Sequence, residues 1–312
     1  MHGAGSRILA GMLVMLVFGS ALAAKTKNGF SMEDLLVPAN KIKQGGPERD
    51  GIPALFSPRF VVAADVNDLD AQDRVLGITY AGVTKAYPLR ILNYHEIVND
   101  RFNTTPVAIT FCPLCGSGIA FFAEAGGRTR RFGVSGLLYN SDVLMYDRET
   151  DSLWSQIMGQ AISGPAKGTT LKPLPVRHTT WRDWRTRHPD TLVLVPPPQS
   201  RHNYNIDPYA GYADSNKIWF PVAHTDRRYK KKAVIIGAKI GEVTKAWPFE
   251  NLPASRRRID DTVGALAVVV EYDLQAQAGR ILDAGGRELP SFTVYWFAWI
   301  AFHPDTEVYT KP

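Results

Sequence analysis

Two repeated segments constrain the fold of this 312-residue chain more than any other feature. The segment 83–89, Val-Thr-Lys-Ala-Tyr-Pro-Leu, recurs at 243–249 as Val-Thr-Lys-Ala-Trp-Pro-Phe. A second segment, 181–191, has the form Trp-x-x-Trp-x-x-x-His-Pro-Asp-Thr and recurs in the same order at 296–306. Two matched signals in one order indicate an internal duplication. We place the copies at 60–195 and 220–312, with a linker at 196–219.

The two copies differ in length between these signals. From Lys85 to His188 is 103 residues, whereas from Lys245 to His303 is 58. The first copy therefore has about 45 extra residues, in an interval that holds both cysteines and the stretch 132–142. The second copy also has no counterpart of His95. We expect the first copy to carry the functional site and the second copy to be scaffold.

Short runs of β-branched and aromatic residues, separated by turn residues, predict a fold rich in strands. Such runs lie at 75–80, 83–87, 107–111, 119–122, 143–147 and 192–195. Short helices are predicted at 180–187, where Thr180 can cap the first turn, and at 89–98. The predicted class is α+β and β-rich. It consists of an internally duplicated β-sheet or barrel-like module with short helices, whose first copy carries a Cys-x-x-Cys insertion.

The first 23 residues have the pattern of a secretory signal. Arg7 precedes an apolar stretch at 8–22, and Ala21-Leu22-Ala23 offers a cleavage site. We therefore expect a periplasmic or secreted protein that is not an integral membrane protein after cleavage, with an N-terminal extension at 24–59. In such a compartment free thiols tend to oxidise.

Composition argues against two broad function classes. Basic clusters at 128–131, 230–232 and 256–258 are scattered and have no interleaved aromatic residues, so nucleic acid is not an expected partner. No glycine-rich phosphate loop is present, so no nucleotide cofactor is expected. The expected partner is an unknown small molecule, a metal donor or a thiol-bearing molecule.

The only two cysteines lie in the segment Cys112-Pro113-Leu114-Cys115-Gly116. This form is typical of a metal knuckle, in which a tight turn points backbone amides at two thiolates. A second cysteine pair is absent, so a metal needs other ligands, and two thiolates with an imidazole suit copper or zinc. His95 is the leading third ligand. Other candidate ligands are Glu96, Met145, His178 and His303.

Two alternatives remain open for the cysteine pair. In a periplasmic thiol–disulfide oxidoreductase, Cys112 and Cys115 are catalytic, one as nucleophile and the other resolving. The β-prone run after Cys115 is a poor helix start, so the usual helix dipole that stabilises a thiolate is not expected. In a non-catalytic module that binds a ligand or partner, the pair is a structural disulfide. Whether the protein is an enzyme stays open.

Polar residues of the first copy form a second candidate site. Ser135, Asn140 and Asp142 lie in or beside a glycine-bearing loop, and together with Glu96 they are candidate binding residues. The same residue types also make turns.

Several segments resemble one family. They are Gly-Gly-Pro-Glu-Arg-Asp-Gly-Ile-Pro-Ala-Leu at 45–55, the segment 86–100 around His95-Glu96, Thr-Phe-Cys-Pro-Leu-Cys-Gly-Ser at 110–117, and 132–147. Together they resemble the domain-of-unknown-function family 3179 over residues 45–309. The resemblance implies an exported prokaryotic-type protein and no particular activity. The family pattern includes His95, Glu96, Cys112, Cys115, Ser135, Asn140 and Asp142.

Overall fold

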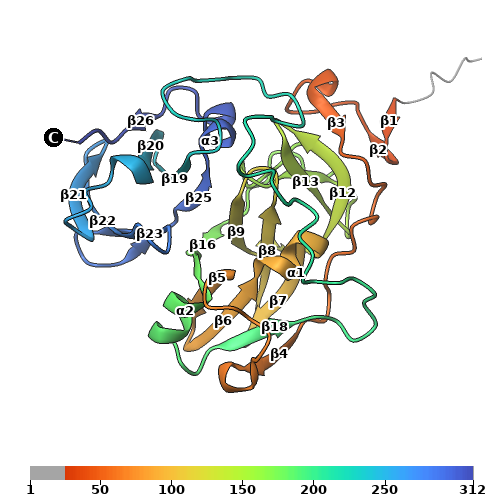
Figure 1. Ribbon diagram of the computed structural model, residues 1–312. Coiled ribbons are helices and arrows are strands. Elements are labelled where there is room, and N and C mark those ends of the chain that lie inside the picture. Colours follow the sequence, from red (N-terminus) through yellow and green to blue (C-terminus); the bar gives the residue numbers. More distant parts are fainter. Residues whose placement is uncertain (1–24, 312) are drawn as a thin grey trace, which may run out of the picture.

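The computed structural model describes residues 25–311, so the predicted secretory signal lies outside the described residues. Five sheets of four or five strands dominate the described part of the chain, in outline like the blades of a five-bladed propeller (Figure 1). This part has three short α-helices: α1 (Leu89–His95), α2 (Trp181–Arg187) and α3 (Trp296–Phe302). It also has three 3-10 turns at Ala39–Lys41, Ala63–Asp65 and Phe249–Asn251. The predicted β-rich class is therefore confirmed.

The first unit consists of two sheets that share one apolar core. One sheet has the order β17 (Arg177–Thr180), β5 (Arg74–Tyr80), β6 (Val83–Pro88), β18 (Leu192–Val195) and β4 (Arg59–Val62). The other has the order β16 (Pro173–Leu174), β9 (Ser117–Phe122), β8 (Thr105–Cys112) and β7 (Ile97–Phe102). Leu76, Tyr87, Phe102, Ile109 and Leu194 are among the side chains buried between them.

The second unit has the same plan. One sheet has the order β25 (Phe292–Tyr295), β19 (Val234–Ile240), β20 (Val243–Pro248) and β26 (Glu307–Val308). The other has the order β21 (Arg258–Val263), β22 (Leu266–Asp273), β23 (Ala278–Asp283) and β24 (Glu288–Leu289). Ile236, Trp247, Val270 and Ile281 lie in the core between them.

The repeated tryptophans explain one part of the sequence pattern. Gly77 of β5 and Gly237 of β19 face Ala86 and Ala246 in the same register. A Cβ at Gly77 would lie 2.3 Å from the ring of Trp184, and a Cβ at Gly237 would lie 2.6 Å from the ring of Trp299. Each indole therefore lies directly on the backbone of a strand. The indole N–H of Trp184 donates to Thr191 at 3.0 Å, and that of Trp299 donates to Thr306 at 2.9 Å.

The repeated Val-Thr-Lys-Ala-aromatic-Pro segment contributes the lysine of a buried ion pair in each unit. Lys85 Nζ lies 2.8 Å from Asp100, and Lys245 Nζ lies 2.8 Å from Asp261. The aromatic residue two positions later also donates to that carboxylate, through the Tyr87 hydroxyl at 2.6 Å or the Trp247 indole at 2.7 Å. Because an ion pair out of water needs such further hydrogen bonds, the lysine and the aromatic residue recur together.

The two units contact each other reciprocally. Strand β25 of the second unit packs against β9 of the first, and β17 of the first unit packs against β23 of the second. Since β17 and β25 hold the same place in their sheets, and β9 and β23 also correspond, the two contacts are equivalent by an approximate two-fold relation.

The extra residues of the first unit begin after β9, so the predicted position of the insertion needs a correction. Strand β16 pairs with β9 in the first unit as β24 pairs with β23 in the second. The extra segment therefore lies between the end of β9 and the start of β16, at 123–172. The cysteines precede it, in a β8–β9 loop that the second unit matches in length. The extra segment forms β10 (Glu124–Ala125), β11 (Arg128–Thr129), β12 (Phe132–Tyr139), β13 (Asp142–Asp147), β14 (Leu153–Ser155) and β15 (Gln160–Ala161).

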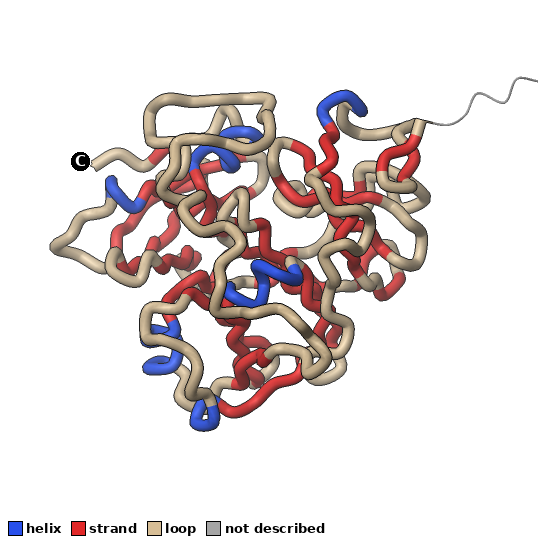
Figure 2. Tube along the Cα trace, turned by 45° about the vertical axis from the view of Figure 1, so that its right-hand side comes forward, coloured by secondary structure: helices blue, strands red, loops and turns tan. Residues whose placement is uncertain are grey.

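The N-terminal residues add one strand to the sheet that the extra segment forms. Strand β3 (Ile42–Gln44) pairs with β12 at the edge of the extra sheet, while β1 (Thr26–Lys27) and β2 (Phe30–Ser31) form a hairpin. Between the units, residues 196–233 form a long loop across the molecule (Figure 2). We call it the crossover segment. Among residues 25–311, no helix is long and apolar enough to span a membrane.

Candidate metal centre

The two cysteines lie at the ends of a tight loop between β8 and β9. The Cys115 amide donates to the Cys112 carbonyl at 3.2 Å, and Gly116 has a φ of +61°. A side chain at Gly116 would meet the Tyr295 ring, because a Cβ there would lie 2.9 Å from it. The Tyr295 amide donates to the Cys115 carbonyl at 2.9 Å. The second unit therefore holds the cysteine loop in place.

The corresponding loop of the second unit has no sulfur. Asp273, the last residue of β22, holds the place of Cys112, the last residue of β8. Its carboxylate accepts from the amides of Gln275 and Ala276, each at 2.9 Å. A side chain that caps the loop thus replaces the thiols, and the loop conformation does not depend on cysteine.

The extra sheet brings a hairpin turn over the cysteine loop. Asn140 and Ser141 connect β12 to β13, with φ values of +53° and +67°. Two residues with positive φ are typical of a type I′ turn, which usually contains glycine. The Asn140 side chain fixes this turn by donating to Ala301 O at 3.0 Å and accepting from Ala223 N at 2.8 Å. A strained turn held by distant contacts is a common feature of functional sites.

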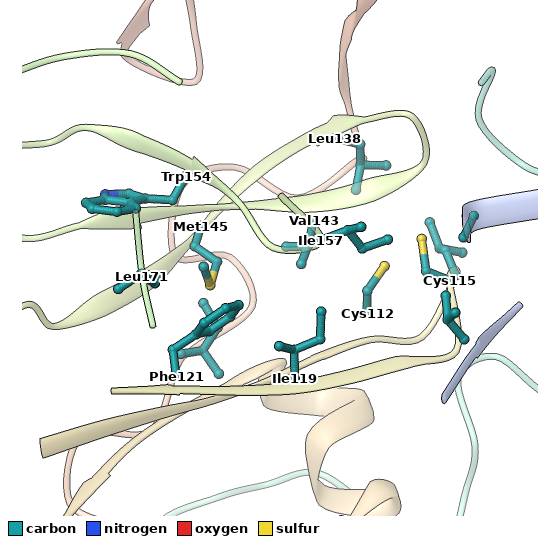
Figure 3. Packing of buried hydrophobic residues seen from close by; sticks show 14 of the residues in the cluster. Cys112, Cys115, Ile119, Phe121, Leu138, Val143, Met145, Trp154, Ile157 and Leu171 are labelled. Atoms are coloured by element: carbon teal, nitrogen blue, oxygen red, sulfur yellow. The ribbon is translucent and has the colours of Figure 1, made fainter. Parts of the chain in front are cut away.

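The turn presents oxygen atoms to the two sulfurs. The Ser141 carbonyl lies 3.7 Å from Cys112 Sγ and 3.4 Å from Cys115 Sγ. Figure 3 shows both sulfurs pointing toward the hairpin that carries Leu138 and Val143. Neither cysteine forms a disulfide.

Asp142 completes a group of three possible metal ligands. One ligand atom from each of Cys112, Cys115 and Asp142 lies within 4.8 Å of the other two, and all three residues are buried. Asp142 Oδ2 accepts from the Ile157 amide at 3.0 Å. Its Oδ1 and the Ser141 hydroxyl are buried without a partner among the described residues. The arrangement can hold a metal ion, which would satisfy the unpaired oxygen.

Burial makes the acidic groups of this centre hold their protons. It raises the pKa of Asp142 to about 7, against which the hydrogen bond from Ile157 acts. It raises the pKa of both thiols, and the carboxyls of Asp142 and Glu96 add to this effect. Desolvation disfavours the charged form of an acid, and a nearby negative charge acts in the same direction. A cation placed here would oppose both effects, because a nearby positive charge favours the charged form of an acid.

Glu96 lies beside the centre and lines a separate small cavity. It follows α1 with a φ of +55°. Burial, and then the charge of Asp142, raise its pKa to about 8, while Tyr209 hydrogen-bonds to it. The cavity has a volume of about 110 Å³ and is lined mainly by apolar side chains, including Leu114 and Phe220.

The structure does not bring His95 to the sulfurs. Its Nδ1 lies 2.7 Å from the Pro53 carbonyl, and its Nε2 lies 2.6 Å from the Tyr204 hydroxyl. Both ring nitrogens therefore have partners, and the ligand group found among residues 25–311 contains Asp142 in place of the expected histidine. His95 instead fastens the crossover segment to α1.

The other candidate ligands lie elsewhere. His178 is buried in β17 next to the Phe111 ring, with neither ring nitrogen paired within the described residues. Burial lowers its pKa well below the usual value. His303 packs on Trp299 with ring centroids 4.1 Å apart, and Met145 is buried in the core.

Of the predicted polar residues, Asp142 enters the ligand group, whereas Ser135 and Asn140 support it. The Ser135 hydroxyl donates to the Leu144 carbonyl and accepts from the Leu137 amide, at the irregularity in the β12–β13 pairing. Sequence reasoning did not assign Asp142 to the metal. The available signal was weak: an Asn-Ser pair lies between two β-prone runs, and Asn tolerates the left-handed conformation that a two-residue hairpin turn needs. Such a turn places Asp142 at the start of the second strand.

A cleft borders the cysteine loop. Its volume is about 680 Å³, and Phe111 and Pro113 line it together with Tyr209, Tyr212 and Tyr295. The two tyrosines at 209 and 212 belong to the crossover segment and lie within the predicted linker 196–219. No local signal in the sequence distinguishes them as site residues. The crossover segment is thus part of the site's wall.

Comparison with known proteins places the chain in a family. The sequence profile of DUF3179, described as a protein of unknown function, matches residues 49–287. The chain therefore belongs to the DUF3179 family, as the resemblance implied. No curated protein and no solved structure matches the chain significantly.

Proposed function

We propose that this protein binds one transition-metal ion through Cys112, Cys115 and Asp142. The supporting observation is that their ligand atoms lie within 4.8 Å of one another, with one Asp142 oxygen buried and unpaired. A tetrahedral zinc site has metal–sulfur bonds of about 2.3 Å and metal–oxygen bonds of about 2.1 Å, which separate its ligand atoms by about 3.5–3.8 Å. The distances in this group are compatible with that geometry after small side-chain adjustments.

The ligand types favour zinc over copper. Thiolates suit both metals, but a carboxylate is a hard ligand that copper(I) does not prefer. Three protein ligands leave a fourth position, which a molecule from outside could occupy. Zinc sites with three protein ligands and an open position are typical of catalysis, whereas closed sites are typical of structure.

The proposal includes the origin and location of the protein. Common strand order, common register and the repeated segments support duplication of one unit, followed by addition of the extra segment to the first copy. The apolar stretch and cleavage pattern in residues 1–23 support export to the periplasm or beyond. N-terminal sequencing of the mature protein tests export, and the expected first residue is Ala24.

Metal content tests the proposed function. The protein, purified under reducing conditions, is expected to bind one zinc ion per chain after reconstitution, measured by mass spectrometry of the native protein. Cys112→Ser should lose stoichiometric binding, and Asp142→Asn should bind zinc more weakly and retain less than one ion per chain. Asp273→Asn is the matched control, because it alters the corresponding loop of the second unit, and it should leave metal content unchanged.

His95→Gln distinguishes this site from the one expected from sequence. Because both ring nitrogens contact other groups, the variant should still bind one metal ion. Absence of metal from the wild-type protein, or full retention in Asp142→Asn, contradicts the proposed site.

Thiol–disulfide exchange is the second candidate, since the two thiols are free and adjacent. The thiolate is the reactive form, and burial raises the pKa of both cysteines, which disfavours that form. We therefore expect slow alkylation of the folded, metal-free protein. Rapid alkylation of one cysteine at neutral pH would favour the redox function over metal binding.

A further inference from the structure

A second feature, lined by none of the three proposed metal ligands, is a groove where β17 and α2 of the first unit meet β23 of the second. Two adjoining hollows, of about 300 and 410 Å³, make up this groove. Arg177, Arg187 and Arg280 line both hollows, so three guanidinium groups from three elements lie at its centre. We call it the arginine groove.

The three arginines are not equally neutralised. Arg187 pairs with Asp183 at 2.8 Å, and Arg280 pairs with Glu271 at 2.6 Å and with Glu288 at 3.5 Å. Arg177 is half-buried and has no ion-pair partner within residues 25–311. Burial lowers the pKa of Arg177; the carboxylate of Glu288, and more weakly that of Asp183, act against this, while the charges of Arg280 and Arg187 add to it. An unpaired cation that is partly removed from water is costly unless a ligand compensates it.

The second unit shows that the fold does not require arginine at these positions. Arg177 is the first residue of β17, and Phe292 is the first residue of β25. Arg187 and Phe302 end helices α2 and α3, and Arg280 and Ile119 are the third residues of β23 and β9.

The equivalent contact between β25 and β9 is therefore apolar. Ile119 is buried in a large core, against which Phe292 and Phe302 pack. One junction between the units is filled by hydrophobic side chains. The other, related to it by the approximate two-fold, has three arginines around open hollows. Hydrophobic packing would stabilise that junction more simply, so the arginines need another explanation.

We propose that the arginine groove binds a phosphate-type oxyanion. Guanidinium groups present paired N–H donors that match the oxygens of phosphate, and several around one anion give charge-assisted hydrogen bonds. Arg177 is the main proposed ligand of the anion, because Arg187 and Arg280 already pair with carboxylates. Arg257 and Arg258 also line the hollow of about 300 Å³, but each has an acidic partner, Asp273 at 3.2 Å and Asp260 at 3.9 Å, so Arg177 carries the proposal. No residue that lines the groove is a proposed metal ligand.

Calorimetric titration with inorganic phosphate at low ionic strength tests the proposal. The wild-type protein should bind one phosphate per chain, and Arg177→Gln should weaken binding at least tenfold, because it removes a charged donor pair. Arg177→Lys should retain part of the affinity. Arg258→Gln, at an exposed rim position, is the control and should weaken binding less than threefold.

Arg177→Phe gives the second, sharper test, because it introduces the residue that the second unit has at this position. It should abolish phosphate binding and leave the melting temperature without phosphate equal to or above that of the wild type. Absence of phosphate binding by the wild type overturns the proposal, as does unchanged binding by Arg177→Phe. A lowered melting temperature without phosphate shows a structural role for Arg177 and also overturns it.

Sedimentation with phosphatidylcholine vesicles containing phosphatidate identifies the source of the oxyanion. Sedimentation that depends on Arg177 assigns a lipid headgroup. Phosphate binding without sedimentation assigns a soluble phosphate compound.

Discussion

The pH dependence of zinc affinity follows directly from the burial of the three proposed ligands. A metal ion displaces each proton that its ligands hold, and each displaced proton weakens the apparent affinity tenfold for every pH unit of acidification. Both thiols are protonated well above neutral pH, because burial raises their pKa. Asp142 becomes protonated near pH 7, since burial raises its pKa to about 7.

The expected slope therefore changes near pH 7. Between about pH 9 and 7 the metal displaces two thiol protons, so the affinity falls about 100-fold per unit. Below pH 7 it also displaces the Asp142 proton, and the fall becomes about 1000-fold per unit. From pH 8 to pH 6 the dissociation constant should rise by about five orders of magnitude. An unperturbed aspartate, with a pKa of about 3.9, would release no proton in this range, and the dissociation constant would then rise by about four orders of magnitude.

Competition with a chromophoric chelator, corrected for its own protonation, measures this slope. Asp142→Asn should bind more weakly and lose the bend near pH 7, because it has no proton to release there. Glu96 also has a raised pKa, so Glu96→Gln is the control and should keep the bend. A slope of one proton or less, or a bend that persists in Asp142→Asn, would refute the assignment of these three residues as ligands.

Three further predictions concern stability. In the metal-free protein the pKa values of Asp142 and Glu96 are raised above those of the unfolded chain, so the folded state holds these protons more tightly. Stability is therefore lost as pH rises from about 4 toward 8. Urea unfolding should show lower stability at pH 9 than at pH 5, and a metal-free protein that is more stable at pH 9 would contradict this. Gly77→Ala and Gly237→Ala should each cost about 1–3 kcal/mol, because the new Cβ meets a tryptophan ring, while the exposed Gly285→Ala should change stability by less than about 0.5 kcal/mol; equal effects at all three glycines, measured by thermal unfolding, would argue against the tryptophan contact. Asp100→Asn should cost about 3–5 kcal/mol by leaving the buried Lys85 without its carboxylate, and Asp261→Asn should cost less, because that pair is more exposed; the reverse order in urea unfolding would contradict the burial argument.

The sequence predicted those parts of the fold that local pattern encodes. Short β-prone runs, the helix capped by Thr180 and the correspondence of the repeated segments are all local or periodic signals. In the structure Thr180 accepts from the Asp183 amide at 3.3 Å at the start of α2, as a capping residue does. The repeated segments have a physical basis. Each repeated lysine forms one buried ion pair, and the second tryptophan of each repeat lies on a strand glycine.

Contacts between distant segments were beyond sequence reasoning. His95 seemed the natural companion of the cysteines because it is near them in the chain and absent from the second copy. Its ring instead meets Pro53 and Tyr204, from two segments that no local pattern places beside α1. Asp142 reaches the sulfurs only because the extra sheet folds back over the β8–β9 loop. Equally, the boundary of the extra segment became clear only from strand register, since the cysteine loop and its counterpart share length but almost no residues.

The reciprocal contact between the units has a consequence for cooperativity. The Tyr295 amide of the second unit binds the Cys115 carbonyl of the first, and Arg74 of the first unit binds the Ala276 and Gln277 carbonyls of the second. If one unit unfolded alone, the β8–β9 loop and the β22–β23 loop would both lose these hydrogen bonds. We therefore expect one unfolding transition for the whole chain in place of two. The proposed zinc ion, whose ligands all lie in the first unit, should slow hydrogen exchange in strands β19 to β23, which contribute no metal ligand.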